Sequence, residues 1–123
     1  MSEFRNDIAK VRGLGSAHHG TSHFIVQRVS AIILVPLSLW FLIAVVNMDS
    51  YSYNAVSDWL VNGINGFLLA ALVASIYYHL QLGLQVVIED YIHCHARKII
   101  MLLVVKMVCL LLAASSIFVI LRF

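Results

Sequence analysis

Charged residues are scarce in this sequence, and their absence from long stretches excludes a small soluble fold. Only 11% of the 123 residues are Asp, Glu, Lys or Arg, whereas 62% are hydrophobic. A soluble domain of this length buries a limited fraction of its chain and could not hide so much apolar surface from water. The composition therefore predicts a protein whose solvent is lipid.

Several chemical groups are also missing. Two cysteines, Cys94 and Cys109, are too few for a disulfide framework or for the four thiolates of an iron–sulfur cluster, and we expect both to be unpaired. No glycine-rich dinucleotide motif is present, so we do not expect this chain to bind a flavin. A net charge of +2 without a basic stripe gives no reason to expect a nucleic-acid partner.

Three stretches are almost free of charge and long enough to cross a membrane. Val29–Met48 and Trp59–Ile88 contain no charged residue, and Ile99–Leu121 contains only Lys106. A bilayer core of about 30 Å needs about 20 helical residues, and an open strand would leave its peptide groups unpaired in hydrocarbon. The predicted fold is all-α, a single membrane-anchor domain over the whole chain. We place its transmembrane helices at about 24–48, 62–91 and 97–121.

The positions of Lys and Arg indicate the orientation. Basic residues occur before and at the start of the first span and between the second and third spans, but not in residues 49–58. They are Arg5, Lys10, Arg12, Arg28, Arg97 and Lys98. Since cytoplasmic segments carry the excess of positive charge, we expect the N-terminus in the cytoplasm. Neither a secretory signal nor a transit peptide is expected, and the predicted location is the bacterial cytoplasmic (inner) membrane, in contact with phospholipid.

His79 lies near the middle of the second predicted span, where polar side chains are costly and usually functional. A neutral imidazole can offer a nitrogen to a metal, and haem iron is the common metal at this depth in a helical bundle. Gly83, one turn away, would let a flat macrocycle approach the helix backbone. The alternative is an interhelical hydrogen bond from His79 to a neighbouring helix, and the span alone leaves both interpretations open.

Polar residues also gather at the cytoplasmic ends of the first two spans. Asp90 follows His79 by eleven residues, about three turns, so both project from one helix face, about 16 Å apart along the axis. Asp90 can exchange protons and the Tyr91 hydroxyl can donate a hydrogen bond, although a solvated helix end and interfacial anchoring are the alternatives. Arg28 suits either phospholipid head groups or the carboxylates of a cofactor. The four remaining cytoplasmic histidines are expected at the surface: His18, His19, His93 and His95.

These residues together resemble a known pattern. The motifs His23-Phe-Ile-(x)2-Arg28-x-Ser-Ala31 and His79-(x)10-Asp90-Tyr91 are similar to those of the small hydrophobic membrane anchor subunits of succinate dehydrogenase, respiratory complex II, of the cytochrome b556 type with one haem b. Gly13-Leu-Gly-Ser16 and Pro36-Leu-Ser-Leu-Trp40 also look like bacterial members. The resemblance covers most of the chain, and the combination of motifs is specific.

The resemblance implies a role for each matching residue. His79 corresponds to an axial haem ligand, and Tyr91, with Asp90 beside it, to a tyrosine that hydrogen-bonds a ubiquinone carbonyl. Arg28 and His23 correspond to residues near the haem propionates and the quinone pocket.

The resemblance also implies partners. A second membrane (cytochrome b) subunit would share haem b and supply the other half of a heterodimeric helix bundle, and iron–sulfur and flavoprotein subunits would dock on the cytoplasmic face. The chain would not oxidise succinate itself, but would belong to an oxidoreductase complex that passes electrons from succinate to ubiquinone in the respiratory chain and tricarboxylic acid cycle.

Two other functions remain open. An anchor of quinol:fumarate reductase would use similar residues, because the direction of the reaction depends on potentials set partly by other subunits. A small transporter or assembly protein with a chance histidine is the other alternative, although a transporter would more plausibly show broken helices or repeated polar gates.

Overall fold

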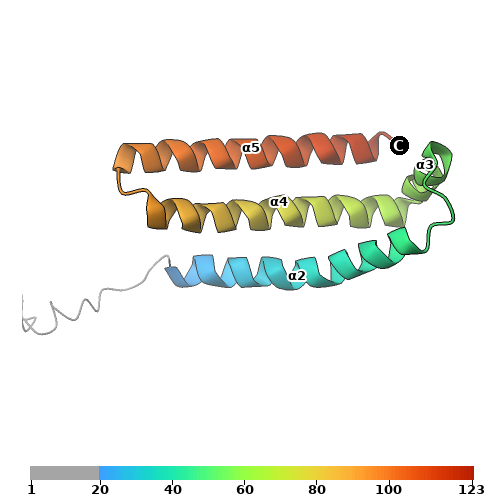
Figure 1. The fold of residues 1–123 in the computed structure, drawn as a ribbon, viewed down its shortest axis with the longest axis horizontal. Coiled ribbons are helices and arrows are strands. Elements are labelled where there is room, and N and C mark those ends of the chain that lie inside the picture. The colour runs from blue at the N-terminus through green and yellow to red at the C-terminus, as the bar shows by residue number, and fades with distance from the viewer. Residues whose placement is uncertain (1–19) are drawn as a thin grey trace, which may run out of the picture.

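The computed structural model describes residues 20–123, which form three long helices and one short one. The long helices are α2 (Gly20–Val46), α4 (Gly63–Tyr91) and α5 (His95–Leu121), and the short helix α3 spans Tyr53–Val61. Helix α4 packs against both α2 and α5, and Figure 1 shows the three long helices in one row with α4 in the middle. Arg5, Lys10, Arg12, His18, His19 and Gly13–Ser16 lie outside the described residues.

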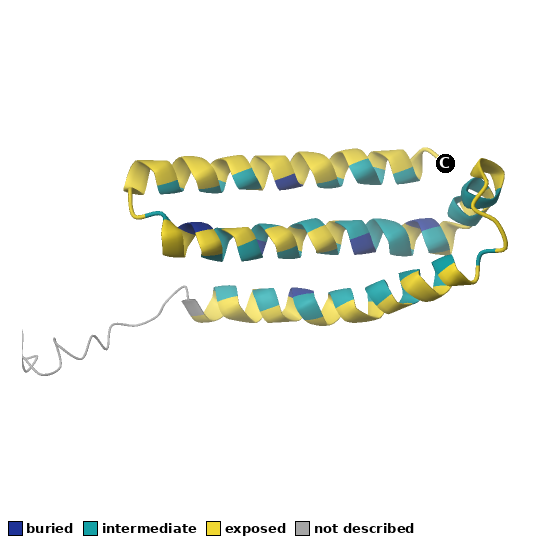
Figure 2. Ribbon diagram, viewed as in Figure 1, coloured by how far each residue is buried: buried dark blue, intermediate teal, exposed yellow. Residues whose placement is uncertain are grey.

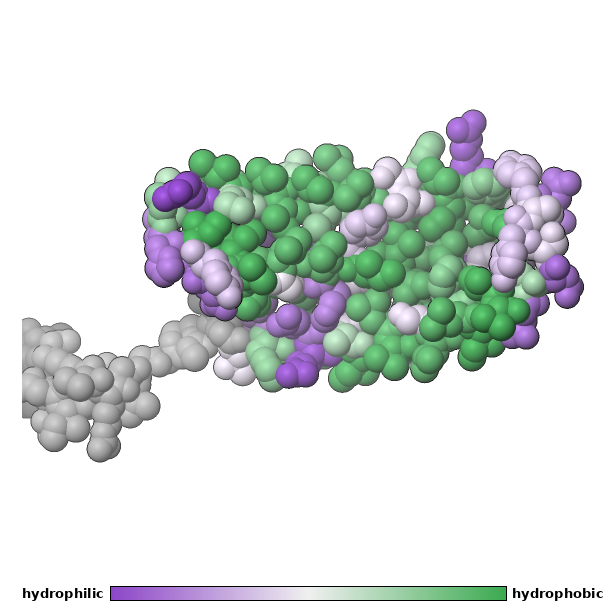
Figure 3. All heavy atoms as spheres, in the orientation of Figure 1, coloured by the Kyte–Doolittle hydropathy of each residue, from purple (hydrophilic) through white to green (hydrophobic). Residues whose placement is uncertain are grey.

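Each long helix is long and apolar enough to cross a bilayer. They contain 27, 29 and 27 residues, and at 1.5 Å per residue each is about 40 Å long, more than the hydrocarbon core requires. The prediction of an all-α fold with three spanning helices is confirmed. Figure 3 shows apolar surface along most of the row, with polar residues at both ends and in one further patch on the side of α2.

Very few side chains are buried within the chain. The buried apolar residues in the described part are Leu72, Leu82, Ile88 and Cys109, whereas Ile32 and Phe67 are about 70% exposed. Figure 2 shows the buried positions as isolated patches on the sides where the helices face one another. A single row of helices leaves both broad faces uncovered. Exposed apolar surface of this extent requires lipid or further helices as its neighbours.

Helix α2 continues through Pro36 without a break. Proline removes one backbone donor and crowds the preceding turn, which bends a helix. Figure 1 shows α2 curving toward α3 in its second half, where Pro36 lies. Adjacent helices make such a bend tolerable in a membrane.

Helix α3 occupies part of the segment that was expected only to connect the first two spans. Ser52 caps it by accepting a hydrogen bond from the backbone N–H of Ala55 at 3.4 Å. The Trp59 ring stacks on Trp40 of α2, with ring centroids 5.8 Å apart. The turn into α4 brings the backbone of Gly66 so close to the Leu60 carbonyl oxygen that an added Cβ would lie 3.0 Å from that atom. These contacts fix α3 across the end of the helix row.

Candidate functional site

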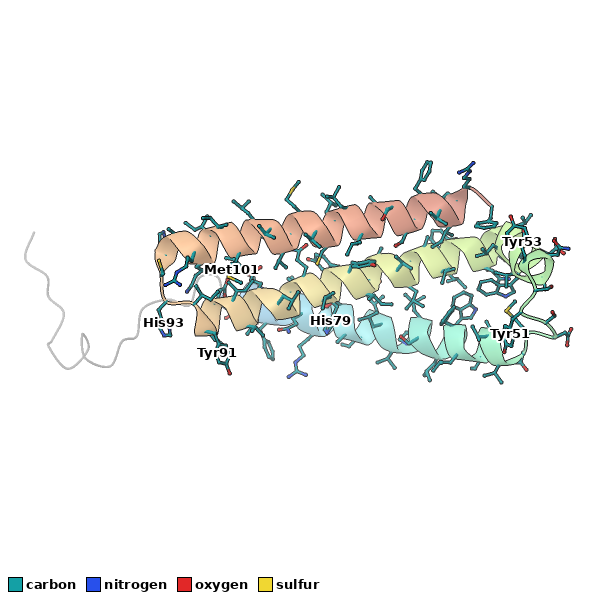
Figure 4. All side chains as sticks on the ribbon, turned by 45° about the horizontal axis from the view of Figure 1, so that its top comes forward. Tyr51, Tyr53, His79, Tyr91, His93 and Met101 are labelled. Atoms are coloured by element: carbon teal, nitrogen blue, oxygen red, sulfur yellow. The ribbon has the colours of Figure 1, made fainter. Side chains whose placement is uncertain are left out.

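His79 lies where α4 crosses α2, and its imidazole reaches a serine on the neighbouring helix. The Oγ atom of Ser30 is 2.8 Å from Nδ1 of His79 and 2.8 Å from the carbonyl oxygen of Gln27. Ser30 is only 5% exposed and is the buried polar residue of the described chain. Figure 4 shows His79 between the two ends of the row, with Tyr91 and His93 at one end and Tyr51 and Tyr53 at the other. The interhelical hydrogen bond that the sequence left open as an alternative is therefore present.

The number of available protons limits the possible directions of these hydrogen bonds. A serine hydroxyl has one proton, and the Gln27 carbonyl oxygen can only accept. With its proton on the Gln27 carbonyl oxygen, the Ser30 hydroxyl accepts from His79 in the tautomer that carries the imidazole proton on Nδ1. A neutral histidine protonated at Nδ1 carries its lone pair on Nε2. Within the described residues Nε2 has no hydrogen-bond partner, so the hydrogen bond and a metal-ligand role are compatible.

The surface beside His79 is open at Gly83. An added Cβ at Gly83 would meet no atom within 4 Å. The backbone at Gly83, one turn from His79, therefore has open space beside it. In residues 20–123 no group of three or more His, Cys, Asp or Glu side chains could hold a metal ion.

Tyr91 and Asp90 lie at the last turn of α4 and are both exposed, Tyr91 by 79%. Tyr91 follows His79 by twelve positions, about 18 Å along the axis, so the chain does not bring these two side chains into contact. The neighbouring Glu89 accepts a hydrogen bond from Gln85 at 2.8 Å, and its backbone carbonyl accepts one from Lys98 at 3.0 Å. The second contact ties the end of α4 to α5 and fixes the turn beside Tyr91.

His23 and Arg28 both lie on α2 but have different environments. The Arg28 guanidinium lies 5.2 Å from the centre of the Phe24 ring and is otherwise exposed. His23 is half-buried, and its Nε2 atom is buried without a hydrogen-bond partner in the described chain. His23 also lines a groove of about 500 Å³ between α2 and α4, together with Ser22, Val26, Tyr78, Leu82, Gln85 and Glu89. Arg28 does not line this groove, so the structure does not join the two residues in one pocket.

The turn between α4 and α5 carries the remaining polar residues. His93, Cys94 and His95 are all exposed there, and Cys94 is the N-cap residue of α5. Hydrogen bonds from the backbone and then from the side chain of Arg97 lower the pKa of the Cys94 thiol. Both cysteines are free, and Cys109 is buried within α5.

Sequence reasoning missed two features of this region. Ser30 is not among the candidate site residues that the sequence predicts, although a small polar residue in an apolar span is a signal for a hydrogen bond to another helix. No role for Gln85 or Glu89 is predicted from the sequence, whereas the structure places both in the groove with His23.

Comparisons with known proteins agree with the helices and motifs described above. The family of succinate dehydrogenase/fumarate reductase transmembrane subunits matches residues 2–114. A succinate dehydrogenase hydrophobic membrane anchor subunit of Rickettsia bellii (strain RML369-C) is 38% identical over 109 residues, which cover 89% of this chain and 87% of the relative.

Two further relatives have the same description. The subunit of Rickettsia conorii (strain ATCC VR-613 / Malish 7) is 33% identical over 88% of this chain and 86% of its own length. That of Paracoccus denitrificans is 31% identical over 70% of this chain and 67% of its own length. No solved structure matches the chain significantly.

Proposed function

This chain belongs to the family of succinate dehydrogenase/fumarate reductase transmembrane subunits, and we propose that it binds haem b through His79 and contributes to a quinone site as the hydrophobic membrane anchor of succinate dehydrogenase. The match to the Rickettsia bellii relative covers 89% of this chain and 87% of that relative, and three candidate membrane spans accompany it. The observation that carries the haem assignment is the Ser30–His79 hydrogen bond, because it leaves Nε2 of a mid-span histidine available to iron.

The residues around His79 fit a haem. Nε2 would supply one axial ligand, and the open surface at Gly83 would receive the edge or face of the macrocycle. A haem held in this way supplies one-electron storage between the electron donor and the quinone. The second axial ligand would come from another subunit, since no other histidine of this chain lies in the interior of a span.

Arg28 would act at the edge of the haem site. It lies two residues from Ser30, about 3 Å along the α2 axis but about 200° around it, so its side chain starts on the face of α2 away from the Ser30–His79 contact and would meet a propionate from that outer face. The Phe24 ring holds the guanidinium by a cation–π contact. A guanidinium fork in this place can bind a propionate in bidentate fashion, with His23 as a further polar group at the same end of α2.

Tyr91 and Asp90 would serve the quinone. Reduction of a quinone to a quinol consumes two electrons and two protons. The Tyr91 hydroxyl would donate a hydrogen bond to a quinone carbonyl oxygen and so orient the ring, and Asp90 would take up a proton from the aqueous face and hold it beside that oxygen. Their exposure in this chain leaves both side chains accessible to a quinone and to partner subunits.

The partners and orientation complete the proposal. A second membrane subunit would cover one face of the helix row, and iron–sulfur and flavoprotein subunits would dock near Tyr91. The basic residues at the start of the first span and in the first turn of α5 favour the cytoplasmic side for that end. The anchor of a quinol:fumarate reductase remains the second candidate, because the matched family includes both enzymes.

Purification of the complex through a tag on this chain tests the proposal. We expect succinate dehydrogenase activity, quinone reduction by succinate and stoichiometric haem b to copurify with it. A chain that purifies without any of these from membranes rich in succinate dehydrogenase would contradict the proposal. The ratio of succinate oxidation to fumarate reduction in the same preparation would decide between the two enzymes.

A further inference from the structure

Ser30 is the buried polar partner of His79 on the neighbouring helix, and it contacts both His79 and the backbone of its own helix. Its hydroxyl lies 2.8 Å from the Gln27 carbonyl oxygen and 2.8 Å from His79 Nδ1. If the hydroxyl proton pointed at His79 Nδ1, the Ser30 Oγ and the Gln27 carbonyl oxygen would lie 2.8 Å apart without a proton between them. The stable arrangement is therefore a chain of two hydrogen bonds, from His79 Nδ1–H to Ser30 and from Ser30 to Gln27.

We infer that Ser30 is a positioning residue that fixes the tautomer and ring orientation of His79 for iron binding through Nε2. The inference rests on the proposed function. A ligating histidine commonly donates its other ring N–H to a polar group, which sets the tautomer and raises the basicity of the ligand. Here that group is a hydroxyl rather than a carboxylate, and it is itself held by a backbone carbonyl one turn earlier in α2.

Loss of the hydroxyl has three chemical consequences. The proton of the neutral imidazole becomes free to occupy Nε2, and that tautomer cannot bind iron. The ring loses the contact that limits its rotation about the Cβ–Cγ bond. The imidazole that still binds iron is also a weaker electron donor, so it stabilises ferric haem less and the haem midpoint potential rises.

The surroundings of Ser30 permit a test that separates the hydroxyl from the shape of the side chain. A small open groove of about 210 Å³ adjoins Ser30 and is lined by Val29, Ile33, Ser75 and Tyr78 among others. This space can take extra methyl groups. Ser30→Thr keeps a hydroxyl. Ser30→Val has nearly the same shape as threonine but no hydroxyl, and Ser30→Ala removes the hydroxyl without adding volume.

Helix α5 offers a matched control. Ser115 donates to the Leu112 carbonyl three residues earlier at 3.0 Å, the same local hydrogen bond that Ser30 makes to Gln27, but it is exposed and no histidine accompanies it. Ser115→Ala therefore removes a back-bonded serine from a membrane helix without touching His79.

The experiment measures haem content and haem midpoint potential in the purified complex of each variant. We expect Ser30→Val and Ser30→Ala to weaken haem retention about 10- to 100-fold and to shift the potential upward. Ser30→Thr should restore both properties, and Ser115→Ala should leave both at the wild-type values.

The outcomes separate this inference from the proposed function. Wild-type values of retention and potential in Ser30→Val and Ser30→Ala, in a complex whose haem is lost in His79→Ala, would overturn the role of Ser30 alone. A wild-type complex whose haem does not depend on His79 would overturn the proposed function itself. If Ser30→Val fails to assemble, Ser30→Ala and Ser30→Thr still decide the matter, because loss in Ala with retention in Thr supports the role and equal behaviour contradicts it.

Discussion

His79 and Tyr91 lie on one uninterrupted helix, α4, twelve positions apart (79 to 91) and about 18 Å apart along its axis. The helix fixes the separation between them, because no break or proline interrupts it. The proposed haem ligand and the proposed quinone donor are therefore rigidly connected but not in contact. Substitutions at the two residues should have separable effects.

Tyr91→Phe keeps the ring and removes the hydroxyl. A quinone oxygen left without its donor costs about 1–3 kcal/mol, so quinone reduction by succinate should fall roughly tenfold or more. The haem spectrum and succinate oxidation with a soluble artificial acceptor should be nearly unchanged. An equal loss in both activity assays would show that Tyr91 acts on assembly instead.

Arg28→Lys distinguishes a cofactor contact from a lipid anchor. A lysine ammonium reaches head groups and can lie over Phe24, but it lacks the planar fork that binds a carboxylate in bidentate fashion. We expect the complex to assemble and its haem potential or quinone turnover to change. Arg122→Lys, at the opposite end of the helix row, serves as the control, and wild-type values in both assays would leave Arg28 as a lipid anchor.

Cys94 reports the orientation of the chain. It is exposed in the α4–α5 turn, whereas Cys109 is buried and serves as an internal control. A membrane-impermeant maleimide should label Cys94 in inside-out vesicles and not in intact spheroplasts. Labelling from the periplasmic side would reverse the proposed topology.

The same thiol should show a distinct pH dependence. The Arg97 backbone and side chain lower the pKa of Cys94, so the reactive thiolate persists to lower pH than in an ordinary cysteine. Alkylation should rise with pH through this lowered pKa. Arg97→Gln removes part of the effect and should move the midpoint of the alkylation profile to higher pH, and an unchanged midpoint would contradict the role of the Arg97 side chain.

Gly66 and Gly63 form a matched pair for the α3–α4 turn. Alanine is a better helix residue than glycine by about 1 kcal/mol, but a Cβ at position 66 would lie 3.0 Å from the backbone oxygen of Leu60, while one at position 63 meets nothing within 4 Å. Gly66→Ala should lower the thermal stability of the complex and Gly63→Ala should not. Equal melting temperatures of the two variants would mean that the α3–α4 turn can move to accommodate the added Cβ without loss of stability.

The three long helices can be predicted from the sequence because the apolar composition of each segment is what makes it a membrane-spanning helix. A run of apolar residues without charge has one stable form in lipid, and its length sets the span. Helix α3 could not be predicted in the same way, because its nine residues depend on contacts with other segments, such as Trp59 on Trp40 and the packing of Gly66 against Leu60.

The candidate site also has features that the sequence predicts and features that depend on contacts between helices. The mid-span position of His79 is a property of the sequence, and so is its common face with Asp90. The contact with Ser30 depends on the register between α2 and α4, which no local pattern specifies, and the groove that joins His23 to Glu89 depends on it too. Direct contacts between helices are therefore what the structure adds.

The most direct test of the haem assignment is the reduced-minus-oxidised optical spectrum of the purified complex with His79→Ala, beside wild type and His93→Ala as a control for an exposed histidine. We predict a low-spin b-type haem band in wild type and His93→Ala, and its loss or conversion to high spin in His79→Ala, because only one axial ligand would then remain on the partner subunit. An unchanged low-spin band in His79→Ala would contradict the assignment.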